Sequence, residues 1–411
     1  MTAVLDQILS AERRKAYGAA LDLLATKLAE DEHMIGLGFP YVTAPDGSWR
    51  TMPASRSAGY TGGAWSHGNW FCGFWVGLHL AAYLWTLNER HLAWAKERML
   101  LVAPRADDPN THDIGFIFWG SAIPLFHVTG DPRYAGMALR AADRLRARLI
   151  TTRGGAYISS WGPLSDQRGR RSSAIDTMAN LPLLYWAADR ADDGSFRLAG
   201  EAHAKMTRAA FVRADFSTYH AVEYDLATGA RARGFTFQGA FDESCWPRGQ
   251  AWAIYGFAAT ARATGKPEHL ELAERLADYY LARLDNGLVP YWDFDDPAIP
   301  DAPRDSSASA IAAAALLDIG AQHPDAGTAG RRAEQACSLL DALCRDYLAH
   351  EPGHRGLLKC GCYSKSHGEG VASAVLFGDF YFVEALMKLL LPGRFQPPAC
   401  RSDEQPAREA L

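Results

Sequence analysis

The chain has 411 residues, of which 48% are hydrophobic and 22% are charged, as expected for a globular protein with a large core. Its formal net charge of -5 argues against a nucleic-acid partner, and no block of like charges or long apolar run indicates a membrane partner. We therefore expect the partner to be a small molecule.

The cysteines and the first ten residues both predict a cytoplasmic protein. Seven cysteines, an odd number scattered through a long chain, are typical of reduced thiols. Residues 1–10 carry acid and amide groups where a signal peptide needs a continuous apolar core. Cys360 and Cys362 form the one close pair, and without a second pair they do not predict a zinc site. No metal or other cofactor is expected, because the sequence has no phosphate-binding glycine loop, His-Glu-x-x-His motif or Gly-x-Ser-x-Gly elbow.

Apolar residues recur with helical spacing along most of the chain. Short strands or hairpins are expected only at 155–161, 219–225 and 289–293. No linker divides the sequence, so we predict a single catalytic domain over residues 1–391 and a C-terminal tail at 392–411. The periodicity predicts about twelve helices, at residues 4–30, 72–87, 90–104, 114–129, 132–150, 179–190, 194–212, 245–264, 267–284, 306–320, 327–348 and 371–391.

The predicted helices alternate in what precedes them. Odd-numbered helices follow tight turns such as Thr129-Gly130-Asp131-Pro132. Even-numbered helices follow longer stretches rich in polar and aromatic side chains, at residues 65–70, 111–113, 173–176, 242–246, 305–307 and 363–367. Six such hairpins predict an all-α fold, the (α/α)6 toroid or six-hairpin barrel, with outer helices around an inner ring whose N-termini share one cavity. The alternative is an open array of hairpins, which no repeat of fixed length supports.

Asp176 lies just before one of the predicted inner helices. Because proline is tolerated in a helix mainly in its first turn, Pro182 predicts a helix that begins with Asn180 as N-cap and runs to about Asp189. Burial would raise the pKa of Asp176 and the positive helix end would lower it, so this carboxyl group is a candidate to hold or release a proton. The alternative is a charge that only complements the helix dipole.

Asp113 precedes another predicted inner helix. Two carboxyl groups with different pKa values are the usual apparatus for acid–base chemistry on sugars, and tryptophan rings suit stacking on pyranose faces. We expect roughly half of the tryptophans near these turns to be ordinary core residues. The four candidates are Trp70, Trp161, Trp246 and Trp252.

Arg248 lies at the start of a further inner helix, where its guanidinium group could hold a carboxylate of the substrate. The alternative is an ion pair with Asp242 or Glu243. His220 and Gln238 lie in the loop before this helix and could position a water molecule or bind hydroxyl groups. A single loop histidine more often makes ordinary hydrogen bonds.

Five segments, in order along the chain, resemble the unsaturated glucuronyl hydrolases of glycoside hydrolase family 88. The likeness runs from about Trp70 to Leu390. The segments are His112-Asp113-Ile114-Gly115-Phe116, Ile175-Asp176-Thr177-Met178-Ala179-Asn180-Leu181-Pro182-Leu183-Leu184, Trp246-Pro247-Arg248-Gly249-Gln250-Ala251-Trp252, Pro290-Tyr291-Trp292-Asp293-Phe294 with Asp305-Ser306-Ser307-Ala308, and Gly378-Asp379-Phe380-Tyr381.

This resemblance implies a six-hairpin toroid and an enzyme that removes the 4,5-unsaturated uronic acid from the non-reducing end of lyase-generated oligosaccharides. The implied reaction is hydration of the C4=C5 vinyl ether, without a metal or redox cofactor. Asp176 would be the general acid/base that protonates C4 and helps water add at C5. The resulting hemiketal would collapse, open the ring and release the aglycone. Asp113 would bind sugar hydroxyls and keep Asp176 correctly protonated.

The same resemblance implies which residues bind the substrate. His220 and Gln238 would orient the water or the C5 region of the sugar. Arg248 and Trp252 would hold the uronate. The remaining predicted sugar contacts are Trp70, His112, Trp161 and Tyr363.

Two positions depart from the family pattern, which often has His where this chain has Phe237 and commonly has Trp where it has Phe377. Phe237 removes a hydrogen-bonding group near the predicted water, which weakens the role assigned to Gln238. Residues 359–370 are expected to line the aglycone subsite. There Lys365 and His367 could meet a sulfate or a second carboxylate, with solvated surface charges as the alternative.

Other functions remain open on the same fold. They are an unsaturated rhamnogalacturonyl hydrolase, a direct inverting β-glucuronidase that uses Asp113 and Asp176 as its pair, and a toroidal carbohydrate-binding protein without catalysis. The clustering of two carboxyl groups with His220 and Arg248 favours an enzyme, because binding alone needs no poised acid. The sequence does not predict the source polysaccharide, the linkage or sulfation of the aglycone, or the oligomeric state.

Overall fold

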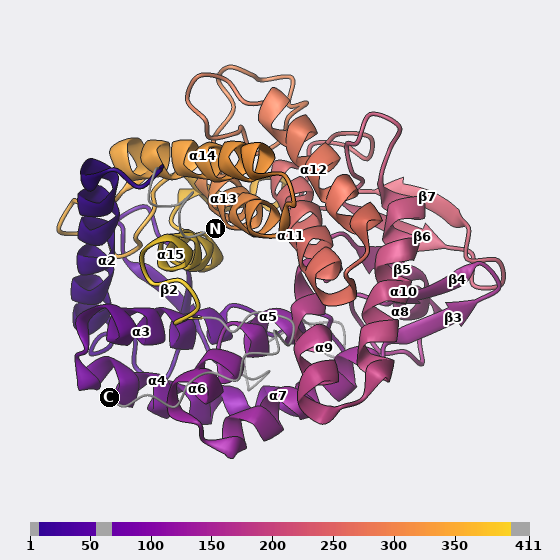
Figure 1. Ribbon diagram of the computed structural model, residues 1–411, viewed down its shortest axis with the longest axis horizontal. Coiled ribbons are helices and arrows are strands. Elements are labelled where there is room, and N and C mark those ends of the chain that lie inside the picture. The colour runs from indigo at the N-terminus through magenta and orange to yellow at the C-terminus, as the bar shows by residue number, and fades with distance from the viewer. Residues whose placement is uncertain (1–7, 55–67, 396–411) are drawn as a thin grey trace.

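The structure is a computed structural model that describes residues 8–54 and 68–395. The start of the first predicted helix, residues 65–67 of the first polar turn and most of the predicted C-terminal tail lie outside the described residues. In Figure 1, α2, α14, α12, α10 and α7 lie at the periphery, and strands β3 to β7 gather on the right-hand side. The described part of the chain is all-α in class, with four small antiparallel sheets between the helices.

Helices dominate the described part of the chain, and the strands that lie between them are short. The helices are α2 (Ala11–Asp31), α3 (Cys72–Thr86), α4 (Glu89–Val102), α5 (Ile114–Trp119), α6 (Ala122–Thr129), α7 (Pro132–Arg146), α8 (Gln167–Arg171), α9 (Thr177–Ala191), α10 (Gly194–Phe211), α11 (Pro247–Thr264), α12 (Pro267–Ala282), α13 (Ser306–Gln322), α14 (Ala326–Ala342) and α15 (Leu376–Leu390). The strands are β1 (Phe39–Thr43), β2 (Trp49–Met52), β3 (Leu149–Thr152), β4 (Gly155–Ile158), β5 (Ser172–Ala174), β6 (Ala221–Tyr224), β7 (Arg231–Phe235), β8 (Gly361–Ser364) and β9 (Glu369–Ser373).

Helices α3, α5, α9, α11, α13 and α15 are buried on nearly all sides. A helix that is apolar around its whole circumference has to be covered by protein, and these six cover one another. Each packs against the next along the chain, and α15 packs back against α3. Glycine permits the closest approaches: a Cβ on Gly73 of α3 would come within 2.0 Å of the Ile117 carbonyl of α5.

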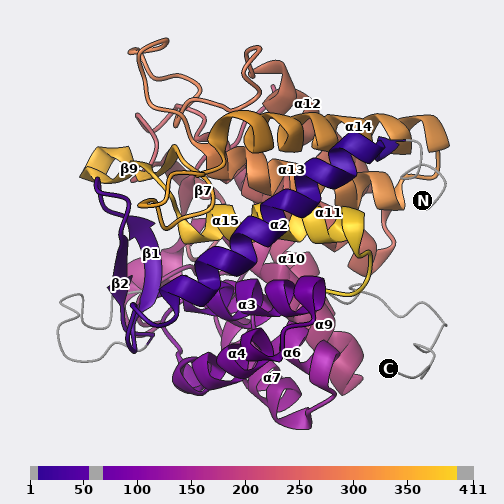
Figure 2. The ribbon, with the colours of Figure 1, turned by 90° about the vertical axis from the view of Figure 1, so that its left-hand side faces the viewer.

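The other long helices bury only one stripe of residues, as expected for helices between a core and solvent. They pack in chain order beside the buried helices, α4 on α3, α10 on α9, α12 on α11 and α14 on α13. Figure 2 shows that β1, β2 and β9 gather at one side of the molecule. The predicted alternation between buried and outer helices is therefore present.

Several predicted boundaries need correction. The first long helix begins at Ala11, and the helix predicted over 132–150 ends at Arg146, because β3 begins at Leu149. The helix predicted over 114–129 is interrupted at Gly120 and Ser121 and forms α5 and α6. The last helix begins at Leu376 and not at 371, because β9 pairs with β8 over the preceding residues. The strand expected at 289–293 is reduced to an isolated bridge between Tyr291 and Arg304. Strands β4 and β6 lie where short strands were expected.

The start of α9 also differs from the prediction. The helix begins at Thr177, so Asp176 occupies the N-cap position and Pro182 lies inside the helix. Asn180 is not the cap: its side chain accepts the Phe116 N–H of α5 at 2.5 Å and donates to the Asp176 carbonyl at 3.0 Å. The position of Asn180 is therefore determined by the packing of α5 against α9. The preference of proline for the first turn of a helix, on which the prediction rested, does not determine it.

Candidate active site

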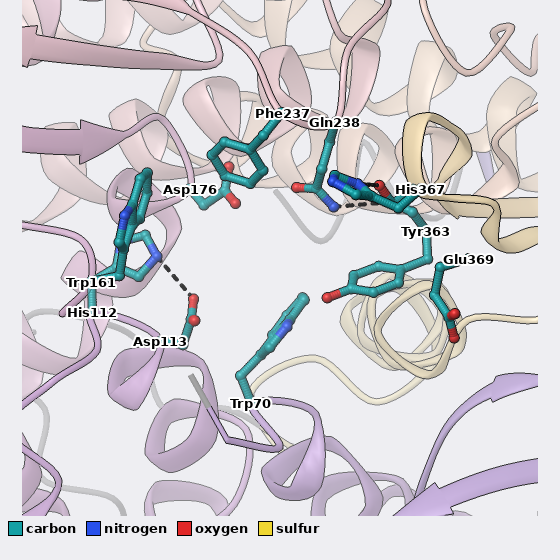
Figure 3. A pocket seen from close by; sticks show the side chains of 11 residues that line it. Trp70, His112, Asp113, Trp161, Asp176, Phe237, Gln238, Tyr363, His367 and Glu369 are labelled. Carbon is teal, nitrogen blue, oxygen red and sulfur yellow. Dashed lines mark hydrogen bonds and ion pairs between the residues drawn. The ribbon is translucent and has the colours of Figure 1, made fainter. Parts of the chain in front are cut away.

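A cavity of about 410 Å³ opens where α5 and α9 begin. Figure 3 shows Asp113 and His112 on one side of it, Asp176 and Gln238 above, Trp70 below, and Tyr363 and His367 on the far side. Seven of the ten predicted site residues line it, together with four further residues from the β7–α11 loop and the β8–β9 hairpin. The seven are Trp70, His112, Asp113, Trp161, Asp176, Gln238 and Tyr363, and the four are Phe237, Ser364, His367 and Glu369.

Asp176 has few groups to stabilise its charge. Its side chain makes no capping hydrogen bond to α9, and its Oδ1 atom is buried without a hydrogen-bond partner among the described residues. Burial raises the pKa of Asp176 to about 7, and the Asp113 charge adds to this rise, whereas His112 and Arg248 oppose it. At neutral pH this carboxyl group is therefore divided between its protonated and ionised forms.

Asp113 lies in a different environment, although it precedes a helix in the same way. Its Oδ2 atom accepts the Thr111 hydroxyl at 3.0 Å, and its Oδ1 atom lies 3.0 Å from His112 Nε2. These donors stabilise the carboxylate form. The cavity thus holds two carboxyl groups in different environments. Asp113 accepts hydrogen bonds, whereas Asp176 has a buried oxygen without a partner among the described residues. Two carboxyl groups in such different environments can act as acid and base in one reaction.

The tryptophans divide into two pairs. Trp70 lines the cavity and stacks on Phe377, with ring centroids 5.2 Å apart, and Trp161 lines it beside the edge of His112. Trp246 and Trp252 are buried in the core, with exposed fractions of 3% and 1%. Two tryptophans are therefore placed to contact a ligand.

Arg248 does not line the cavity. Its guanidinium group forms a buried ion pair with Asp305 at 2.7 Å, and it also donates to the carbonyl oxygens of Cys362 and Tyr363. The alternative of an ion pair is therefore confirmed, but its partner is Asp305 and not Asp242 or Glu243. Arg248 consequently fixes the strand that carries Tyr363 into the cavity wall.

His220 is also buried behind the wall. Its ring lies between Phe237 and Trp246, with centroid distances of 4.1 Å and 4.3 Å. Its Nδ1 atom lies 2.9 Å from Thr236 Oγ1, while its Nε2 atom is buried without a partner among the described residues. Burial keeps the pKa of His220 well below its usual range, so the ring is neutral at physiological pH.

The far wall contains a charged residue, Glu369, that the sequence analysis did not name individually. Glu369 of β9 lines the cavity, where it accepts hydrogen bonds from Tyr41 at 3.1 Å and from Arg50 at 2.8 Å. It lies in the segment 359–370 that was expected to line the aglycone subsite, but the sequence did not single it out, because its pairing with β8 was not recognised. Lys365 does not line the cavity, since its ammonium group pairs with Asp296 at 2.9 Å.

Within residues 8–54 and 68–395, no group of three or more His, Cys, Asp or Glu side chains is arranged to hold a metal ion. In the same part of the chain, no helix is both long and apolar enough to cross a membrane.

The chain is similar to known proteins over most of its length. The unsaturated glucuronyl hydrolase of Bacillus sp. (strain GL1) is 35% identical over 381 residues, which cover 92% of this chain and 96% of that relative. The unsaturated chondroitin disaccharide hydrolase of Streptococcus pyogenes serotype M1 is 34% identical over 78% of this chain and 80% of its own length. A solved structure named as a UGL (unsaturated glucuronyl hydrolase) variant with dGlcA-Glc-Rha-Glc aligns with this structure with a TM-score of 0.85 and 33% sequence identity. The alignment covers 93% of this chain and 99% of that one. No family model matches the chain.

Proposed function

The chain belongs to the unsaturated glucuronyl hydrolases, which are glycoside hydrolases, and from this premise we propose that it removes a 4,5-unsaturated uronic acid from the non-reducing end of a short oligosaccharide. One observation carries the proposal. Asp176 faces the cavity with a pKa of about 7 and an unpaired oxygen, so it can give a proton at neutral pH and then take one back.

The proposed reaction adds water across the C4=C5 double bond of the unsaturated ring. Asp176 donates its proton to C4, and the positive charge that develops at C5 is shared with the ring oxygen. Asp176, now a carboxylate, accepts a proton from the water that attacks C5. The product is a hemiketal at C5. Its collapse to a ketone breaks the bond from C5 to the ring oxygen, and the hemiacetal left at C1 then releases the aglycone as an alcohol.

Asp113 is proposed to bind sugar hydroxyl groups and to maintain the proton on Asp176. Its negative charge raises the pKa of Asp176, which favours the protonated form before the reaction begins. Trp70 and Trp161 are proposed to hold the faces of the sugar, since both rings line the cavity. The further contacts to the sugar and the attacking water are assigned to His112, Gln238 and Tyr363.

Three predicted residues support the site from behind its wall. We propose that Arg248 acts on the uronate through the backbone of Tyr363, which it holds in place. Trp252 packs on Phe116, with ring centroids 4.9 Å apart, and supports the start of α5. The neutral ring of His220 is proposed to act on the C5 region from behind Phe237, on which it packs with ring centroids 4.1 Å apart.

The fold and the domain organisation of the chain are also part of the proposal. The closed sequence of contacts from α3 through α15 and back to α3 supports an (α/α)6 toroid, and the one large core cluster of the described residues supports a single domain. The bounds proposed from the sequence are a domain at 1–391 and a tail at 392–411, of which Phe395 packs into the core. The TM-score of 0.85 with a UGL structure is consistent with this arrangement. A cytoplasmic location stays a prediction, which fractionation of the source cells would test.

A panel of lyase-generated disaccharides, followed by ultraviolet absorbance, tests the function. The wild-type protein should remove the absorbance of the conjugated double bond, and Asp176→Asn should not. A fully active Asp176→Asn variant would refute the assignment of the acid. Release of intact glucuronic acid from a saturated β-glucuronide would favour direct glycoside hydrolysis instead, and calorimetric sugar binding without turnover of any unsaturated uronide would favour a binding protein.

A further inference from the structure

Two buried aromatic rings pack on the guanidinium group of Arg248, which Asp305 and two backbone carbonyls hold in place. The central carbon of this group lies 4.4 Å from the ring centroid of Trp246 and 4.9 Å from that of Phe377. The exposed fractions of the two aromatic residues are 3% and 0%. Arg248 is therefore a fixed cation on which two aromatic side chains rest.

Trp246 connects this fixed cation to the cavity. Its ring packs on His220, which in turn packs on Phe237, with centroid distances of 4.3 Å and 4.1 Å. Gly249 leaves room for the indole, because a Cβ at this position would come within 2.6 Å of it. The last ring, Phe237, lines the cavity with an exposed fraction of 37%, whereas His220 and Trp246 are each only 3% exposed. Arg248, Trp246, His220 and Phe237 thus form a continuous stack from a buried ion pair to the cavity wall.

Phe237 is also fixed by two neighbours outside this stack. Its ring meets Trp161, a second lining residue, edge-on at 5.3 Å, and its backbone carbonyl accepts the Ser366 hydroxyl at 2.8 Å. An aromatic ring that is held in place and exposed within a cavity is suited to contact the apolar face of a ligand. The C–H groups of a pyranose ring provide such a face.

We propose that Phe237 contacts the sugar in the cavity and that Trp246 is the positioning residue that holds Phe237 there, acting through His220. This inference rests on the proposed function, since the sugar is the unsaturated substrate. Removal of the indole would leave a space beside His220, into which the imidazole and then the Phe237 ring can move. Arg248 would stay in place, because its ion pair and its carbonyl contacts do not involve Trp246.

A double-mutant cycle on binding tests both parts of the proposal. In the Asp176→Asn background, which removes the proposed acid, calorimetry measures the Kd of an unsaturated disaccharide. We expect Trp246→Leu and Phe237→Ala each to raise Kd by about three- to tenfold, as expected for the loss of aromatic contacts. In the Phe237→Ala protein, Trp246→Leu should raise Kd by less than about twofold, because the ring through which Trp246 acts is already absent. Effects that simply add would overturn the inference, as would a Trp246→Leu protein that binds as tightly as the parent.

Three further variants separate positioning from a general loss of core packing. Trp246→Phe keeps a flat ring and should restore most of the affinity. Gly249→Ala should raise Kd by displacing the indole instead of removing it, and again only while Phe237 is present, so it replaces Trp246→Leu in the cycle if that variant does not fold. Trp186→Leu is the matched control, since it removes another buried indole, which packs on Phe126 and does not line the cavity. It should leave Kd unchanged, and a rise equal to that of Trp246→Leu would overturn the inference.

A crystal structure of the Trp246→Leu protein tests the positioning role without any ligand. We expect the Phe237 ring to be displaced and Trp70, which stacks on Phe377 at 5.2 Å, to stay in place. An unmoved Phe237 ring would overturn the inference. If the wild type acts on no unsaturated uronide, the proposed function fails, and the position of Phe237 in this variant still tests whether Trp246 holds it.

Discussion

Replacing Asp176 with Asn separates what this side chain does for catalysis from what it does to stability. Its pKa is about 7 in the folded protein, against an ordinary value of 3.8. Between these pH values the folded state binds the extra proton, so the contribution of Asp176 to stability is greatest below about pH 4, falls as the pH rises and levels off above about pH 7. At about 1.4 kcal/mol for each tenfold change in proton affinity, the ionised group lowers the free energy of unfolding by up to about 4 kcal/mol.

Asparagine cannot ionise, so Asp176→Asn should avoid this loss. We expect the variant to be more stable than the wild type at pH 8, by up to about 4 kcal/mol, while its activity falls by about 10²- to 10⁴-fold. Urea unfolding followed by circular dichroism measures the first effect, and loss of ultraviolet absorbance by an unsaturated disaccharide measures the second. Unfolding at pH 4 is the internal control, because both side chains are neutral there in the folded state and little of the ionisation effect remains. A variant that is less stable than the wild type at pH 8, or that keeps a tenth of its activity, would refute this reasoning.

Changes of pH and substitutions of the other charged residues in and around the site give further predictions. Wild-type kcat/KM should decline by about tenfold per pH unit above about pH 7, where Asp176 loses its proton, and a profile that stays flat to pH 9 would contradict this. Asp113→Asn should move the decline to lower pH, because it removes a charge that raises the pKa of Asp176; an unmoved decline would show that the two groups are uncoupled. Arg248→Met should cost about 3–5 kcal/mol in urea unfolding, because it leaves the buried charge of Asp305 unpaired, and adding Asp305→Asn should recover part of this. Glu369→Gln should raise kcat/KM for a sulfated over an unsulfated aglycone by about two- to fivefold, with a smaller effect in high salt; a ratio that ignores salt would exclude an electrostatic cause.

Local sequence pattern was sufficient to find the long helices, since their apolar periodicity is a property of neighbouring residues. It was insufficient for most of the short strands, although β4 and β6 lie where strands were expected, because a short strand is defined by its pairing partner. Strand β5 consists of Ser172–Ala174 and is defined by pairing with β6 at Ala221–Tyr224. Similarly, nothing near Val371 distinguishes a strand from a helix until its partner Cys362 is known.

The site residues also divide into those that local sequence could predict and those whose environment depends on distant parts of the chain. Asp113 and Asp176 were found because a carboxyl group before a buried helix is visible in the sequence, and both line the cavity. The position of Arg248 was predicted but its environment was not, because the pairing carboxylate of Asp305 lies 57 residues further along the chain. Asn180 failed as a helix cap for a related reason, since its partner is a backbone N–H of another helix.

Four aspartates stand at or near the N-terminal ends of buried helices, and helix position alone gives them equivalent roles. Their donors distinguish them. Asp305 accepts from Arg248 and from two backbone N–H groups, and both oxygens of Asp379 accept backbone N–H groups at 2.9 Å. Burial raises the pKa of Asp379 to about 7, the value of Asp176, yet Asp379 does not line the cavity, so its proton has no substrate to reach. Asp113 faces the cavity but is supplied with donors. Only Asp176 of these four combines a raised pKa, an unpaired oxygen and access to the cavity, and these three properties together, more than its place before a helix, make it the proposed acid.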